Sequence, residues 1–364
     1  MMANGSNANV TLAKIRNGTA YFQYDNTTYS AEIKAVQKVL YLYGYYPGGR
    51  DGYYGASTQA AVKGFQNEKD LTVNGNLNKA TLAKLEAWSG TLYGTSTVTP
   101  TLSQVRNGLD YFHTGDAGSQ VTTIRNKLIS KGYTCASTGT YDSALVAVVK
   151  RFQSNVGLSA DGLVGQGTLA VLEDTTSDTG WLTSSGTVNL TAGKLARAGF
   201  TNIMLRRDIV TKLNTALNTY GITSKMKVRQ FLAQCMAETD MGRSLVEYLY
   251  KPGTTGSASY APYYGAGMLH LTWKSNYTAY KEFKGNADAK IIDPSEYATQ
   301  HVAIAYPADS AGWFWDKCAN LNSVINWTSD AETVCSILTE KINGGTADAS
   351  RRYGYYKTIA AVLK

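Results

Sequence analysis

Residues 33–66 read IKAVQKVLYLYGYYPGGRDGYYGASTQAAVKGFQ, two helical patterns on either side of a glycine-rich turn. In the first pattern, apolar residues recur at i, i+3, i+7 and i+10 and share one helix face: Ile33, Val36, Leu40 and Tyr43. The second pattern has Ser57 as its predicted N-cap and an apolar stripe of Ala60, Ala61 and Phe65. Asn74-Gly75 predicts a turn before a third short helix that carries Leu82 and Leu85. The stretch therefore predicts a compact bundle of three helices.

A second copy of this bundle follows. Residues 121–172 resemble residues 33–85, and Phe152-Gln153 and Asp161-Gly162 stand where the first copy has Phe65-Gln66 and Asn74-Gly75. The leaders also agree, since IRNGTAYF precedes the first copy and VRNGLDYF the second. An internal repeat of this kind indicates two structural units of the same fold.

Two Ser/Thr/Gly-rich stretches suggest connections between domains: SGTLYGTSTVTPTLS at 89–103 and DTTSDTGWLTSSGTVN at 174–189. We therefore expect three domains, with boundaries at 1–88, 100–174 and 190–364. The fold class we expect is mainly α: two small three-helix bundles and a mostly helical third domain.

Charge and composition exclude several classes of protein. The 364 residues carry a formal net charge of +8, and the basic residues are dispersed, which argues against a nucleic-acid-binding protein and suits a polyanionic partner. No apolar run approaches the roughly 18 residues of a membrane span, so we expect no stable membrane insertion. The first residues, MMANGSNANVTLAKIRNG, lack the apolar stretch of a secretory signal.

Cysteine and histidine are too scattered for a disulfide framework or a zinc site. We expect buried free thiols at Cys135, Cys235, Cys318 and Cys335, and no metal. The three histidines are His113, His270 and His301.

Two carboxylates stand out in MKVRQFLAQCMAETDMGRSLVEYLY, residues 226–250. Glu238 lies close to the apolar face of the predicted helix. Burial there would raise the pKa of its carboxyl toward the range of a general acid. The alternative is a Glu at the edge of the apolar face whose carboxylate hydrogen-bonds to nearby backbone. Glu247 shares a cleft with Glu238 only if the helix ends between them, and Asp240, Gly242 and Ser244 supply a stop. By itself, the position of Glu247 favours a solvated surface residue.

Aromatic residues cluster in YYGAGMLHLTWKSNYTAY, residues 263–280. Tyr263, Tyr264, Trp273 and Tyr277 surround glycines that need a tight backbone. Aromatic rings with polar groups between them suit a sugar-binding cleft, although ordinary core is the alternative.

The two bundles resemble the peptidoglycan-binding domain 1 family. The DGxYGxxT pattern carries the resemblance in the first copy through Asp51, Gly52, Tyr54, Gly55 and Thr58. The second copy departs there and reads TGTYDSAL at 138–145. The resemblance implies bacterial peptidoglycan as partner, and tandem modules would raise avidity for a polymer. Helical spacers without a ligand are the alternative.

The third domain resembles glycoside hydrolase family 19, plant-type chitinases and phage endolysins, through AETDMG, YYGAGMLHLTW-SNY, INGG and RRYGYY. The resemblance implies a lysozyme-like fold with Glu238 as general acid, Glu247 as base and Thr272 positioning the attacking water. It also implies substrate contacts, for which our candidates are Tyr263, Tyr264, His270, Asn276, Asn343 and Arg352. Two residues depart from the family pattern: Ala266 stands where the family has Arg, and the titratable His270 where it has Gln.

The resemblances together predict a phage endolysin of the lysozyme (muramidase) type. It would hydrolyse the β-1,4 bond between N-acetylmuramic acid and N-acetylglucosamine with inversion and without a cofactor. We expect a monomer that is made in the host cytoplasm and reaches the wall after membrane permeabilisation. The alternatives are a chitinase, a catalytically silent wall-binding protein and a bacterial autolysin.

Overall fold

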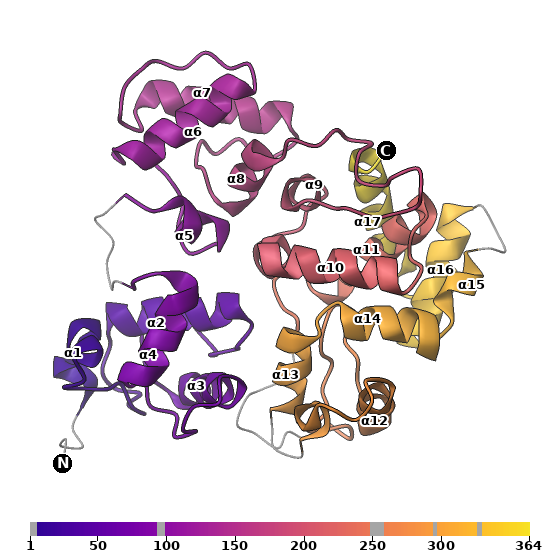
Figure 1. Ribbon diagram of the computed structural model, residues 1–364, viewed down its shortest axis with the longest axis horizontal. Coiled ribbons are helices and arrows are strands. Elements are labelled where there is room, and N and C mark those ends of the chain that lie inside the picture. Colours follow the sequence, from indigo (N-terminus) through magenta and orange to yellow (C-terminus); the bar gives the residue numbers. More distant parts are fainter. Residues whose placement is uncertain (1–5, 93–98, 248–257, 294–296, 326–329) are drawn as a thin grey trace.

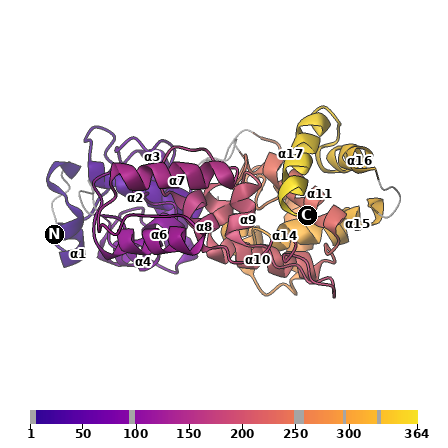
Figure 2. The ribbon, with the colours of Figure 1, turned by 90° about the horizontal axis from the view of Figure 1, so that it is seen from above.

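The computed structural model describes residues 6–92, 99–247, 258–293, 297–325 and 330–364. The fold is mainly helical, as predicted, and the described residues pair as strands only in isolated bridges. Three helical units follow one another along the chain, and the last helix, α17, lies in the third unit, away from the first (Figures 1 and 2).

The first two units share one plan, a short leader helix followed by three longer helices. The first unit consists of α1 (Leu12–Asn17), α2 (Ala31–Tyr43), α3 (Ala56–Glu68) and α4 (Lys79–Ser89). The second consists of α5 (Leu102–Arg106), α6 (Ser119–Ser130), α7 (Ser143–Asn155) and α8 (Gln166–Glu173). The three predicted helices are confirmed in each copy, and the leader adds a fourth.

The predicted apolar stripes form the core of the first unit. Ile33, Val36, Leu40 and Phe65 are fully buried there. The predicted cap at Ser57 is wrong, because α3 begins at Ala56 and Gly55 occupies the cap position without a side-chain hydrogen bond.

A buried glutamine fixes the last turn of each of these units in the same way. Gln66 accepts from the N–H of Gly75 at 2.8 Å, and its amide donates to Thr81 Oγ1 at 3.0 Å. Gln153 makes the corresponding bonds to Gly162 and Thr168. Both glycines have positive φ, +76° and +81°, which explains the Asn-Gly and Asp-Gly turns.

The third unit is a larger helical domain. Its α-helices are α9 (Ala192–Arg197), α10 (Arg207–Thr219), α11 (Lys225–Glu238), α12 (Lys274–Phe283), α13 (Ala298–Ala305), α14 (Asp309–Trp313), α15 (Leu321–Val324), α16 (Ala331–Asn343) and α17 (Ala349–Val362). Helix α11 packs against α17 and α16, and its apolar residues Val228, Phe231 and Leu232 are fully buried.

The stretch that connects the second and third units is packed rather than free. Trp181 is completely buried, and Asn214 and Asn218 on α10 pair with the backbone of Leu190 and Val188. Lys194, also buried, forms an ion pair with Asp174 at 3.3 Å. The cores of the second and third units are consequently continuous.

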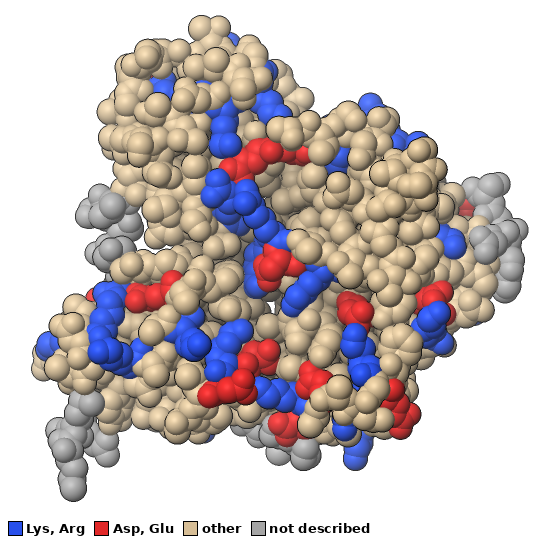
Figure 3. Space-filling view, in the orientation of Figure 1, with Lys and Arg blue, Asp and Glu red and all other residues tan. Residues whose placement is uncertain are grey.

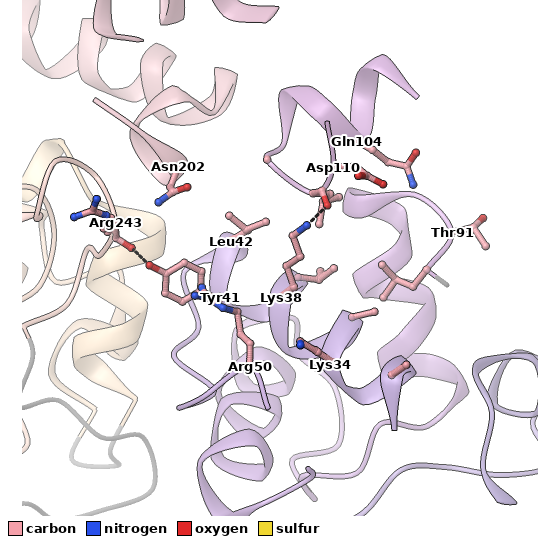
Figure 4. A pocket seen from close by; sticks show the side chains of 16 residues that line it. Lys34, Lys38, Tyr41, Leu42, Arg50, Thr91, Gln104, Asp110, Asn202 and Arg243 are labelled. Atoms are coloured by element: carbon pink, nitrogen blue, oxygen red, sulfur yellow. Dashed lines mark hydrogen bonds between the residues drawn. The ribbon is translucent and has the colours of Figure 1, made fainter. Parts of the chain in front are cut away.

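Contacts between the first unit and the rest of the chain are both apolar and polar: Ile304 of the third unit and Leu109 of the second pack against its core. Charged side chains gather where the three units meet (Figure 3). There Arg206 donates to the carbonyls of Leu42 and Tyr43 at the end of α2. A cavity of about 640 Å³ lies beside α2, where Tyr41 donates to the carbonyl of Arg243 at 2.8 Å (Figure 4).

The cysteines are free, as predicted, but only Cys235 and Cys335 are buried. Cys135 is half-buried and Cys318 is exposed, so the expectation of four buried thiols is wrong for these two. Cys318 ends the π-helical turn Phe314–Cys318, whose buried residue is Trp315.

Candidate active site

Glu238 is the last residue of α11, so its carboxylate stands where the helix stops. Thr239 Oγ1 accepts from the N–H of Gly242 at 3.0 Å, and Asp240, Met241 and Gly242 all have positive φ. The chain therefore turns sharply directly after Glu238. The predicted stop between Glu238 and Glu247 is confirmed.

Three elements distant in sequence surround the Glu238 carboxylate. Arg352 on α17 donates to Oε1 at 2.6 Å, and its other terminal nitrogen donates to Gln234 Oε1 at 2.7 Å. His270 Nδ1 lies 3.5 Å from Oε2. Asn343, at the end of α16, donates its amide to Oε1 at 3.1 Å when the amide is oriented to satisfy both Glu238 and Arg352.

The charges of these neighbours decide the protonation of Glu238. Burial raises the pKa of its carboxyl, but the His270 contact and the Arg352 charge together outweigh burial and hold the pKa below its usual value. The sequence predicted a raised pKa from burial alone, and that prediction is wrong in sign. Glu238 is ionised in the free protein at neutral pH.

Glu247 is held by a short hairpin. Val246 bridges Ala266, which in turn bridges Leu271. The N–H of Glu247 donates to Gly265 O at 2.9 Å, and its Oε2 accepts from the N–H of Gly265 at 2.8 Å. Tyr260 donates its hydroxyl to Oε1 at 2.8 Å. Burial and the nearby Glu247 raise the pKa of Tyr260 to about 12, so this phenol remains a donor at neutral pH.

The same hairpin brings the two carboxylates into one site. A Cβ at position 265 would stand 2.8 Å from both Glu247 Oε2 and His270 Cβ, so Glu247 and His270 lie next to each other across this glycine. His270, with φ of 48°, contacts Glu238 through its ring. The hairpin thus connects Glu238 to Glu247 through one histidine.

Thr272 and Asn276 continue the hairpin into α12. Thr272 is half-buried and donates to His270 O at 2.6 Å, and Asn276 donates to Thr272 O at 2.7 Å. Tyr263 and Tyr264 are only 5% and 2% exposed. Thr272 therefore contacts the hairpin next to His270, and Tyr264 lies close enough to Glu247 to feel its charge. Tyr263 instead donates its hydroxyl to Ile292 O at 3.3 Å. Contacts of these residues with a substrate stay a prediction.

The sequence pattern missed Gln234 and Tyr260. Gln234 lies one helical turn before Glu238, and that i, i+4 spacing could have identified it. Tyr260 precedes the aromatic cluster, and only the fold brings it to Glu247. Ala266, which stands where the glycoside hydrolase family has an arginine, is completely buried. The cation next to Glu238 is Arg352.

The described part of the chain offers neither a candidate metal site nor a candidate membrane span. Its His, Cys, Asp and Glu residues form no group of three or more that could hold a metal ion. None of its helices has both the length and the apolar character that crossing a bilayer requires.

The chain was compared with known proteins at three levels. Among solved structures, it is similar to a family GH19, class IV chitinase from Zea mays at 20% identity, over 46% of this chain and 84% of that chain, with a TM-score of 0.30. No curated protein matches the chain. Residues 29–85 and 117–172, the first two helical units, each match the family model described as "Putative peptidoglycan binding domain".

Proposed function

We propose that this protein is a glycoside hydrolase that degrades peptidoglycan. One observation carries the proposal: Glu247 lies on a hairpin whose His270 contacts Glu238, in a unit that follows two regions matching a peptidoglycan-binding family. Paired carboxylates are the usual machinery of glycosidic bond hydrolysis. The first two units would hold the wall while the third cuts the glycan.

In this proposal Glu238 protonates the glycosidic oxygen, and Glu247, with Thr272, directs water to the opposite face of the sugar. Tyr260 and the Gly265 N–H fix the orientation of Glu247. The hydrolysis would proceed with inversion, which requires carboxyl groups separated by roughly 6.5–9.5 Å. The bond would be the β-1,4 link between N-acetylmuramic acid and N-acetylglucosamine.

The low pKa of Glu238 has a consequence for this mechanism. A general acid must carry a proton before it can donate one. Because His270 and Arg352 favour the ionised form, we expect activity to increase as pH falls toward the pKa of Glu238. The ion pair with Arg352 also favours a second candidate, a wall-binding protein without hydrolase activity.

Product analysis tests the proposal and the bond. Purified peptidoglycan is digested, the new reducing ends are reduced with borohydride, and the fragments are identified by mass spectrometry. Reduced muramic acid ends support the proposed bond, and reduced glucosamine ends contradict it. Release of fragments from chitin oligomers but not from peptidoglycan would identify a chitinase, and release from neither would favour the binding protein.

A lytic role is the biological context that we propose for this activity. A monomeric phage endolysin that reaches the wall after membrane permeabilisation would need both wall binding and glycan cleavage. Lysis of host cells on expression together with a membrane-permeabilising protein, and not with the permeabilising protein alone, would support this role.

A further inference from the structure

The two wall-binding units can be compared residue by residue through their shared contacts. The N–H of Ser30 donates to Gly52 O at 2.9 Å, and the N–H of Gly118 donates to Gly139 O at 2.9 Å. The buried hydroxyl of Tyr54 donates to Gly75 O, and that of Tyr141 donates to the equivalent Gly162 O. The residues that flank these contacts therefore occupy equivalent positions in the two units.

The units differ at one exposed surface. Tyr29 and Tyr53 are 56% and 37% exposed, and their rings meet edge to face with centroids 5.9 Å apart. The equivalent positions in the second unit hold Ala117 and Thr140, which are also exposed and form a backbone bridge. Only the first unit thus presents an aromatic pair here.

The tyrosine pair is fixed by the turn beneath it. Gly52 has φ of +86°, and a Cβ there would stand 2.6 Å from Tyr29 Cε2, so the ring of Tyr29 lies directly over this glycine. The N–H of Tyr53 donates to Asp51 Oδ1 at 3.0 Å. Gly139 in the second unit has no atom within 4 Å of the same point. A ring held in place before binding loses little conformational freedom when a ligand arrives.

We propose that the Tyr29–Tyr53 surface of the first unit binds the face of an N-acetylated pyranose in the glycan strand, and that the second unit lacks this contact. The proposal rests on the proposed function for the identity of the polymer. Aromatic rings pack against the apolar faces of sugar rings, and the hydroxyl of tyrosine can hydrogen-bond at the rim.

The charge next to the pair favours sugar over peptide. Hydrogen bonds from Gln37 and from the Tyr53 backbone hold the pKa of Asp51 below its usual value, against the effect of burial, so a carboxylate stands beside the rings. A fixed negative charge repels the carboxylates of a wall peptide stem, whereas it accepts hydrogen bonds from sugar hydroxyl and amide groups.

Binding of the full chain to purified peptidoglycan tests the proposal. Co-sedimentation at 4 °C is measured for the Glu238→Gln protein with and without Tyr29→Ala plus Tyr53→Ala. We expect the double substitution to weaken binding by about tenfold or more, the effect of losing a central aromatic contact. The control is Tyr111→Ala, which removes a tyrosine of similar exposure (45%) from the second unit and should leave binding unchanged. Unchanged far-UV circular dichroism excludes unfolding.

Two further measurements separate the outcomes. Oligomers of N-acetylglucosamine, which carry neither peptide nor carboxylate, should compete with intact wall for the parent protein, and failure to compete at high concentration would overturn the sugar as occupant. Ala117→Tyr with Thr140→Tyr should strengthen binding by creating a second surface. If the parent protein and the variant with both tyrosines replaced bind equally well, the proposed role of the Tyr29–Tyr53 surface is wrong and the proposed function is not affected. If the parent protein itself does not bind, peptidoglycan is not the partner and the proposed function is wrong.

Discussion

The contact between the first unit and the third centres on a buried histidine, and Glu68→Gln tests the charge at this contact. His301 on α13 is 7% exposed; its Nδ1 lies 2.6 Å from Glu68 Oε2 on α3, and its Nε2 lies 2.7 Å from Asp288 Oδ2. Tyr306 donates its hydroxyl to the same Asp288 oxygen at 2.8 Å. Burial alone lowers the pKa of His301, but the hydrogen bonds and charges of Glu68 and Asp288 outweigh it, and the net pKa is raised.

The raised pKa fixes the direction of the pH dependence. The unfolded histidine titrates near pH 6.5, so the cluster contributes its full stabilisation below about pH 6.5 and loses it as pH rises through the higher folded-state pKa. Asp288 has the opposite behaviour: burial raises its pKa, but His301 and Tyr306 lower it on balance, so its contribution is lost as pH falls below about 4. The cluster is therefore most stabilising between these limits.

The size of the effect follows from what Gln retains. Gln at position 68 can still accept the Nδ1–H hydrogen bond and removes only the charge. Hydrogen bonds to charged groups contribute about 1.5–3 kcal/mol and neutral ones about 0.5–1.5 kcal/mol. We therefore expect Glu68→Gln to lower the free energy of unfolding by about 1–1.5 kcal/mol at pH 6, with a smaller loss at pH 9.

Urea titrations across this pH range measure the loss, and NMR of the three histidine rings measures the pKa of His301 directly. Asp70→Asn is the matched control, since it removes an ion pair with Lys290 at the same contact but with the Asp70 side chain 85% exposed. That change should cost less than about 0.5 kcal/mol. A Glu68→Gln loss that grows with pH, or one no larger than the control, would refute the reasoning.

Three other substitutions test separate parts of the structure. His270→Gln removes a contact that lowers the pKa of Glu238, so the decline of kcat/KM at high pH should move to higher pH; a downward shift in the pH–rate profile would contradict it. Trp181→Ala removes a completely buried ring and should cost about 3–5 kcal/mol in urea unfolding, whereas a free linker would lose almost nothing. Gln66→Leu leaves the buried N–H of Gly75 without its acceptor and should cost about 1–3 kcal/mol by the same measurement; an unchanged midpoint would show that the turn forms without it.

The local features of the fold followed from residue patterns. The helix faces of Ile33, Val36 and Leu40 and the turn at Gly75 depend on neighbours a few residues away, and the periodicity and the Asn-Gly pair predicted them. The cap at Ser57 was predicted from residue preference alone. In the folded protein the loop before α3 sets the helix start at Ala56, so preference did not decide the position.

Residue patterns alone predicted the site only as far as its residues are close in sequence. The family resemblance added His270, Asn343 and Arg352 as candidates, and the structure brings these three to Glu238. The end of α11 after Glu238 could be read from Asp240 and Gly242. The pKa of Glu238 could not, because its sign depends on Arg352 and His270, which the fold brings in from α17 and from the hairpin. The helical pattern of apolar residues shows that a carboxylate lies on an apolar face. It does not show which cationic side chains the fold places next to that carboxylate.

The central claim is that Glu238 is the acid of a glycan hydrolase, and Glu238→Gln tests it most directly. Release of reducing sugar from purified peptidoglycan is measured for the parent protein, for Glu238→Gln and for Glu340→Gln, which changes an exposed carboxylate in the same domain. We predict that the parent and Glu340→Gln proteins release sugar at the same rate, and that Glu238→Gln loses about a hundredfold or more, the usual contribution of a general acid. Equal rates for all three proteins, or no release by the parent while it still sediments with the wall, would contradict the assignment.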